Sequence, residues 1–281
     1  MKKITLLLII CLLSSCAKTG LHVINDFAKS GQFQTYKNIS YGKQKLNLYI
    51  PKEKEVSATV IYFYGGCWGQ CSSYNKDDYL FVAETLTKQG YAVVIPDYRK
   101  YPNVKIDAIL DDAKAATLWT LRNKEKYGIE SDNVFVMGHS AGAHLAAMLV
   151  DDETILGDKL NQINGFIGLA GPYDFYPFNV NDAYLFDLFD KKNNYYASQP
   201  IHFVNGNEPP HLLLQGRNDK KVFVHNAVNL AAKLKQYQVG YELVVFDKMS
   251  HAKIIINLAK PFKNKAEVLP HIVDFIEKHS H

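Results

Sequence analysis

The chain has 281 residues, of which 47% are hydrophobic and 21% are charged, so it is long enough to bury a large α/β core. This balance excludes a disordered chain. The formal net charge is +4, but nearly all basic residues are lysines that alternate with acidic residues. No basic block with interleaved aromatic residues occurs, which argues against nucleic-acid binding.

Residues 1–15 have the features of a cleaved signal peptide. Two lysines precede an apolar run at residues 4–13, which is too short to span a bilayer. Two serines and Cys16 follow, a pattern that resembles a bacterial lipobox, in which the cysteine thiol receives a diacylglycerol. We therefore expect a lipid anchor at Cys16 in the bacterial cell envelope, and Ala17 favours the outer membrane. A plain secretory signal with a chance cysteine is the alternative.

Residues 16–33 are expected to form a polar tether, and residues 34–281 a single domain. The segments 36–41 and 46–50 alternate in polarity, which is typical of a half-exposed hairpin. Buried strands then alternate with helices, and the expected strands are 59–63, 91–95, 133–137, 165–169, 211–214 and 241–246, with helices at 77–89, 107–126, 141–150, 222–236 and 267–278. This alternation predicts an α/β fold, with a mostly parallel central sheet and helices on both faces.

Residues 171–209 interrupt the alternation of strands and helices. They show no clear strand pattern and are rich in aromatic residues: Phe175, Tyr176, Phe178, Tyr184, Phe186, Phe189, Tyr195 and Tyr196. A long aromatic insertion between core strands is typical of a lid or a pocket wall. A structural excursion with its own small core is an equally open interpretation.

The sequence G-H-S-A-G at residues 138–142 carries the main functional signal. It lies between an expected strand and an expected helix, which is the context of a nucleophile elbow. Ser140 would then project from a sharp turn at a helix N-terminus, where negative charge is favoured. We interpret Ser140 as a nucleophile.

A serine nucleophile needs a base and a carboxylate that orients it. Asp219 follows the strand at 211–214, and His251 lies in the loop after the strand at 241–246. In enzymes with a nucleophile elbow of this kind, the triad residues follow in the chain order serine, acid, histidine. The carboxyl ends of parallel strands also meet at one crevice, so residues that follow these strands can lie close together. Asp219 and His251 are therefore the predicted acid and base. Asp174 is the weaker alternative for the acid, and an N-cap is the alternative role for Asp219.

Other polar residues near the motif are interpreted as structural. His139 and His144 flank the serine on a tight turn and are expected to pack or to face solvent. Asp111 and Asp112 lie inside a helical pattern and are expected to hold a neighbouring loop. No metal-binding motif occurs, so we predict neither a metal nor a cofactor.

From about residue 46 onward, the chain resembles the α/β-hydrolase superfamily. Within that superfamily it resembles the esterase/lipase branch related to hormone-sensitive lipase and to the bacterial acetyl and feruloyl esterases. Residues 97–102 read D-Y-R-K-Y-P and resemble the D-Y-R-x-x-P of that branch, and residues 198–201 resemble its S-P segment. The resemblance implies an α/β-hydrolase fold in which residues 171–209 form a cap.

In these relatives an H-G-G-x-W loop supplies oxyanion-hole amides, together with the residue after the nucleophile. The corresponding loop here starts at Tyr64, so the resemblance implies Gly66, Cys67 and Ala141 as donors. Tyr64 replaces the usual histidine, which braces the loop in relatives, so its bracing must differ. Cys67 replaces a frequent glycine, but the donor is the backbone.

Cys67 and Cys71 are separated by three residues in the same loop. Two thiols without further ligands do not make a zinc site, and the spacing is not that of a C-x-x-C redox pair. An oxidising compartment allows a disulfide between them, but so short a ring is geometrically limited, and the sequence leaves the bond open.

Together these features predict a serine carboxylesterase that cleaves small or medium carboxylic esters through an acyl-enzyme. The expected partners are a small-molecule ester and, through the lipid, a membrane. Two alternatives remain: an amidase of the arylformamidase type, and a non-catalytic envelope binding protein. The oligomeric state and the acyl preference are left open.

Overall fold

The computed structural model describes residues 19–28, 32–190, 194–259 and 267–281. The expected signal peptide and Cys16 lie outside these described residues. No helix in the described ranges has the length and apolarity needed to cross a bilayer.

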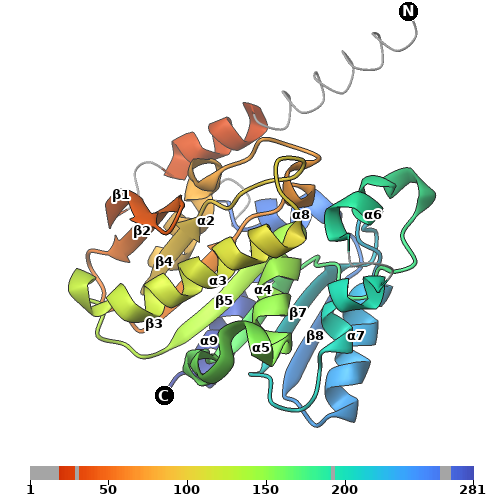
Figure 1. Cartoon of the computed structure of the whole chain (residues 1–281). Helices are drawn as coiled ribbons and strands as arrows, with labels where there is room; N and C mark the ends of the chain where they lie inside the picture. The colour runs from red at the N-terminus through yellow and green to blue at the C-terminus, as the bar shows by residue number, and fades with distance from the viewer. Residues whose placement is uncertain (1–18, 29–31, 191–193, 260–266) are drawn as a thin grey trace, which may run out of the picture.

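One eight-stranded sheet organises the domain, in the order β1-β2-β4-β3-β5-β6-β7-β8 (Figure 1). Its strands are β1 (Phe33–Tyr41), β2 (Gln44–Pro51), β3 (Ala58–Phe63), β4 (Tyr91–Pro96), β5 (Val134–His139), β6 (Gly165–Leu169), β7 (His211–Gly216) and β8 (Tyr241–Phe246). β2 is antiparallel to β1 and β4, and the remaining pairs are parallel. The predicted mostly parallel sheet is confirmed.

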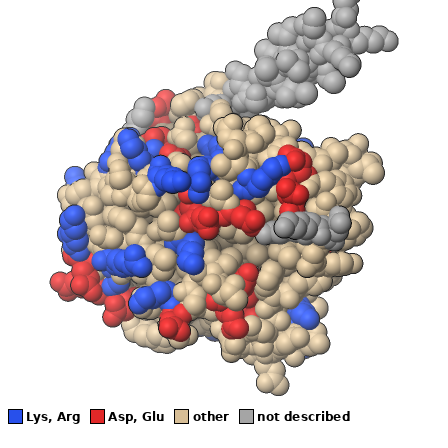
Figure 2. Space-filling model, viewed as in Figure 1, with Lys and Arg blue, Asp and Glu red and all other residues tan. Residues whose placement is uncertain are grey.

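Helices cover both faces of this sheet, as Figure 1 shows. The near face carries α3 (Ile106–Asn123), α4 (Ala141–Asp151), α5 (Glu153–Leu156) and α7 (His225–Gln236), and the far face carries α2 (Leu80–Thr87) and α9 (Val268–Lys278). Every residue of β3 and β5 is buried, as expected for central strands between two helical layers. Basic and acidic side chains are interspersed over the outer surface around α3 (Figure 2).

The helix expected at residues 77–89 is divided into two segments. A 3-10 helix, η2 (Lys76–Tyr79), precedes α2, and a capping box between Asn75 and Asp78 fixes its start. The short helix α8 (His251–Ile256) differs from the loop that the sequence predicts around His251.

The expected tether at residues 16–33 is wrong for its described middle part. Residues 19–28 form a helix whose Leu21, Ile24 and Ala28 are buried in the core. The spacing of three and four residues places these side chains on one face. Asn25 accepts a hydrogen bond from the amide of Phe81 at 3.1 Å and donates one to the carbonyl of Asp77 at 3.2 Å. The helix is therefore part of the domain.

The aromatic insertion contains α6 (Tyr184–Phe189) and short 3-10 helices. Phe178 and Phe189 are buried, with ring centroids 5.7 Å apart, and Trp68 of the neighbouring glycine loop packs on Phe189 at 5.3 Å. Asp187 also accepts a hydrogen bond from Tyr101 at 2.9 Å. The insertion thus has a small aromatic core of its own, which packs on Trp68 of the glycine loop. Its role as a lid or a pocket wall stays a prediction.

Candidate active site

Ser140 occupies the sharp turn between β5 and α4. Its backbone φ is 56° and its ψ is −127°, a region that side chains rarely adopt and that marks strained turns at functional sites. The turn needs glycine on both sides of Ser140, at positions 138 and 142. A Cβ on Gly138 would lie 2.3 Å from the carbonyl oxygen of Gly142, and a Cβ on Gly142 would lie 2.1 Å from that of Phe63. The elbow predicted from the sequence is therefore held tightly against β3.

The structure brings Ser140, His251 and Asp219 into one chain of hydrogen bonds. His251 Nε2 lies 2.8 Å from Ser140 Oγ, and His251 Nδ1 lies 2.8 Å from Asp219 Oδ2. Because an ionised carboxylate can only accept, the proton of the neutral imidazole is on Nδ1. Nε2 is then free to accept the hydroxyl proton of Ser140. The arrangement is that of a nucleophile, a base and an orienting acid.

Asp219 is buried and held as an ionised carboxylate. Burial alone raises its pKa, but the hydrogen bond and charge of His251, with amide donors from Val222 and Lys221, outweigh burial and lower the pKa below the usual value. The two amides lie 2.9 and 2.8 Å from Oδ1. Asp219 therefore closes the turn before α7 and also contacts His251, as predicted. The alternative role as an N-cap is wrong, because the N-cap residue of α7 is Val224.

The glycine loop passes directly beside the nucleophile. A Cβ on Gly65 would lie 2.9 Å from the Cβ of Ser140. The next residues have left-handed backbones, with φ of 125° at Gly66 and 53° at Cys67. The amides of Gly66, Cys67 and Ala141 have no acceptor among the residues that the structure describes. These are the three amides that the family resemblance implies for an oxyanion hole.

Cys67 and Cys71 are joined by a disulfide, with their Cα atoms 5.3 Å apart. The amide of Cys71 donates to the carbonyl of Gly66 at 3.3 Å, so the bridge and the backbone close the same short ring. The bond that the sequence left open is present in the loop, and it holds a non-glycine residue at a positive φ.

The histidines beside the nucleophile are buried, which confirms their predicted packing role in part. His144 receives a hydrogen bond from the Trp68 indole at 3.3 Å, and its Nε2 donates to the Ser198 carbonyl at 2.8 Å. It thereby links the glycine loop to the insertion. His139 contacts the backbone of His251, a relationship that the sequence did not reveal because no motif links the two histidines.

The competing acids have structural partners. Asp174 accepts a hydrogen bond from Asn229 Nδ2 at 2.7 Å. Asp112 accepts from the Arg99 backbone amide and side chain at 2.8 Å, so it holds the loop after β4 as expected. Within the described ranges, His, Cys, Asp and Glu side chains form no group suited to a metal ion.

Sequence comparison relates the chain to known proteins. The BD-FAE family model matches residues 46–234, which is more than half of the 281 residues. A probable isoprenylcysteine alpha-carbonyl methylesterase of Arabidopsis thaliana is 23% identical over 247 residues, which cover 78% of this chain and 51% of that protein. The kynurenine formamidase of Danio rerio is 32% identical over 148 residues, covering 51% and 48%. The chain thus spans about half the length of these relatives.

Structure comparison gives a match over nearly the whole chain. The esterase of Pyrobaculum calidifontis superimposes with a TM-score of 0.78 at 19% identity, covering 96% of this chain and 94% of that one. The predicted α/β-hydrolase fold is confirmed by this likeness. With the family model matching from β2 into α7, across the elbow and the glycine loop, the chain belongs to the BD-FAE family.

Proposed function

We propose that the protein is a serine carboxylesterase that cleaves small or medium carboxylic esters. The observation that carries this proposal is the hydrogen-bonded chain from Ser140 through His251 to Asp219, with 2.8 Å at each step. Its position beside three amides without acceptors among the described residues supports acyl transfer, because such amides stabilise a tetrahedral oxyanion.

In the proposed mechanism, Ser140 Oγ attacks the ester carbonyl while His251 Nε2 takes its proton. Asp219 orients the imidazole and stabilises its charged form. The amides of Gly66, Cys67 and Ala141 bind the developing oxyanion, and each donor of this kind is worth about 3 to 4 kcal/mol. The imidazolium gives its proton to the leaving alcohol, which leaves an acyl-enzyme. His251 then activates water, which releases the acid and frees Ser140.

Ser140→Ala tests this proposal on p-nitrophenyl acetate and butyrate. We expect turnover to fall by at least about 10³-fold, because the covalent step is lost. A fluorophosphonate should label the wild-type protein at Ser140 and leave the variant unlabelled. Wild-type hydrolysis by Ser140→Ala would refute the mechanism. A wild-type protein that is neither labelled nor active would favour the non-catalytic binding protein instead. An acyl-chain series then defines the preferred ester.

Amide hydrolysis is the second candidate activity. The similarity to a kynurenine formamidase, at 32% identity over 148 residues, favours it. The same triad and oxyanion amides would cleave an N-formyl amide through a formyl-enzyme. Parallel assays of p-nitrophenyl butyrate and N-formylkynurenine separate the two, since an esterase is expected to prefer the ester by a large factor in kcat/KM.

We also propose that Cys16 carries a lipid that anchors the protein in the cell envelope, at the outer membrane of a double-membraned bacterium. The support is the sequence Leu-Ser-Ser-Cys directly after the apolar run. Labelling with radioactive palmitate in the bacterium, followed by membrane fractionation, tests the anchor. Cys16→Ser should abolish the label, whereas Cys11→Ser should retain it. Equal labelling of both variants would contradict the proposal.

A further inference from the structure

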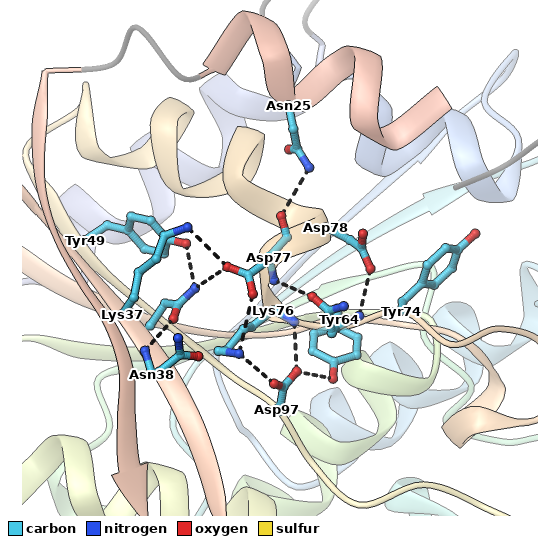
Figure 3. Close-up of polar contacts among 12 residues, drawn as sticks. Asn25, Lys37, Asn38, Tyr49, Tyr64, Tyr74, Lys76, Asp77, Asp78 and Asp97 are labelled. Atoms are coloured by element: carbon cyan, nitrogen blue, oxygen red, sulfur yellow. Dashed lines mark hydrogen bonds and ion pairs between the residues drawn. The ribbon is translucent and has the colours of Figure 1, made fainter. Parts of the chain in front are cut away.

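Tyr64 is fixed in place immediately before the glycine loop. Its ring is buried and stacks between Tyr98 and Tyr79, with centroids 4.7 and 5.4 Å away. Its hydroxyl donates to Asp97 Oδ1 at 2.9 Å, and its carbonyl accepts from the Tyr98 hydroxyl at 2.7 Å. Tyr64 is therefore held at both its side chain and its backbone. Figure 3 shows the contact of its hydroxyl with Asp97.

Asp97 collects three donors from two segments. In addition to Tyr64, the backbone amide of Lys76 donates to Oδ1 at 2.8 Å, and Lys76 Nζ donates to Oδ2 at 2.9 Å. Figure 3 shows Asp97 between Lys76 and Tyr64. The carboxylate thus links η2 to the residue that opens the glycine loop.

Lys76 is an unusual residue for such a link because its side chain is only 7% exposed. Lysine is rarely buried unless it is paired. Its Nζ contacts Asp97, and Asp77 Oδ2 lies 3.5 Å away. Asp77 is itself held by Asn47 Nδ2 at 3.0 Å. The buried lysine is therefore linked through Asp97 to Tyr64, the residue directly before the glycine loop, and its partners are fixed by hydrogen bonds.

We propose that Lys76, Asp97 and Tyr64 form a brace that positions the oxyanion amides of Gly66 and Cys67. The brace rests on the proposed esterase function, since it assigns positioning residues to the same site. The loop after Tyr64 has a positive φ at Cys67 and Trp68, which is unfavourable for residues with a side chain. The disulfide holds Cys67 from within the loop, and contacts from outside the loop hold its two ends.

The far end of the loop is held by the segment that follows Asp97. The amide of Tyr101 donates to the Trp68 carbonyl at 2.9 Å, and a Cβ on Gly69 would lie 2.5 Å from the Tyr101 carbonyl oxygen. The two ends of the glycine loop are therefore pinned to one short segment, residues 97–101. Asp97 anchors that segment to Lys76. Removal of the Lys76 ammonium group would therefore shift the amides that bind the oxyanion.

The test compares Lys76→Met, Asp97→Asn and Tyr64→Phe with Lys124→Met. Lys124 is a matched control, because its side chain is also 7% exposed and its Nζ also pairs with an aspartate, Asp132, at 2.8 Å. Measurements are kcat and KM on p-nitrophenyl butyrate, Tm, and the affinity of a phenylboronic acid, whose adduct with Ser140 mimics the tetrahedral intermediate. Tyr64→Phe removes one oxygen and keeps the ring stack, so it is expected to fold even if Lys76→Met does not.

We expect each brace variant to lower kcat and boronate affinity together by about 10-fold or more, because small displacements of oxyanion donors are costly. KM should change less than about twofold, since the loss concerns the transition state. The double variant Lys76→Met with Asp97→Asn should lose no more kcat and boronate affinity than the more impaired single variant, because the two residues act through the same contact. Lys124→Met should keep wild-type kcat and boronate affinity.

Wild-type kcat and boronate affinity in Tyr64→Phe and Lys76→Met would overturn the brace, as would an equal loss in Lys124→Met. A wild-type protein that does not hydrolyse the ester would count against the proposed function instead. Boronate binding needs only Ser140 and the oxyanion amides, so it still tests the brace in that case.

Discussion

His139 donates a hydrogen bond to the backbone carbonyl of His251, with Nε2 and the oxygen 3.0 Å apart. The two rings also pack, with centroids separated by 4.9 Å. Because a carbonyl only accepts, the proton of His139 is on Nε2. Nδ1 is buried and has no hydrogen-bond partner among the described residues. Burial, and then the charge of His251, lower the pKa of His139 to about 3, so His139 is neutral and fixes the backbone of the base.

The neutral state of His139 predicts a loss of stability in mild acid. A histidine in the unfolded chain has a pKa of about 6.5, whereas the pKa of His139 in the folded chain is about 3. Between these values the unfolded state binds one more proton. The contribution of neutral His139 to the free energy of unfolding is therefore fully present above about pH 6.5. It is lost as the pH falls toward the folded pKa, by about 1.4 kcal/mol for each pH unit.

Urea unfolding between pH 7 and pH 4 measures this slope. Glutamine at this position keeps an N–H donor but does not titrate, so His139→Gln should show a shallower pH dependence by about 1.4 kcal/mol per unit. His22 is exposed in the helix at residues 19–28, and His22→Gln should follow the wild type. Parallel curves for His139→Gln and the wild type would contradict a neutral buried His139.

Asp219→Asn should reduce kcat strongly without a comparable change in KM. The amide would present either a donor or a weaker acceptor to His251 Nδ1, which now lies 2.8 Å from a carboxylate oxygen. The wrong tautomer of the base then dominates, and a loss of about 10³- to 10⁴-fold is expected. Asp174→Asn is the control, since Asp174 also follows a strand but pairs with Asn229. A larger loss in Asp174→Asn would make Asp174 the acid.

The disulfide should affect kcat mainly by holding the backbone of Cys67, whose φ is 53°. A residue with a Cβ is disfavoured there, and the bond to Cys71 holds it in place. We expect Cys71→Ser to lower kcat by about 10-fold. Adding Cys67→Gly should restore most of this loss, because glycine adopts positive φ without strain. Thiol titration confirms the state of each variant, and a double variant no better than Cys71→Ser would refute this explanation.

The sequence predicted the parts of the site that local patterns define. The glycines at 138 and 142 and the apolar strand before them specify the elbow, because a Cβ would meet the first turn of α4 at Gly138 and the backbone of β3 at Gly142. Asp219 and His251 follow strands of the parallel sheet, and parallel strands bring their carboxyl ends to one edge. Local patterns and sheet topology were thus enough to bring the three polar residues together.

Contacts between distant segments could not be predicted where neither a motif nor the strand order marks the residues. The ion pair of the buried Lys76 and the partly buried Asp97 joins residues 21 positions apart, and neither belongs to a pattern that marks burial. Likewise, a stretch with modest apolar content suggested a tether, but residues 19–28 fold because Asn25 finds partners beside α2. The aromatic insertion gave no periodicity, since its rings pack on each other and on Trp68 instead of facing a sheet.

Gly142→Ala should destabilise the fold as well as the site. The added Cβ would lie 2.1 Å from the carbonyl oxygen of Phe63, which is backbone and cannot rotate away. The first turn of α4 would have to move off β3, and Ser140 with it. We expect a loss of at least about 3 kcal/mol in unfolding free energy, or failure to fold. Gly240→Ala is the control, because its Cβ would meet only Pro210 at 3.7 Å, an ordinary contact. Urea unfolding of both variants should leave Gly240→Ala within about 0.5 kcal/mol of the wild type, and equal stability of the two would show that α4 can shift freely on the sheet.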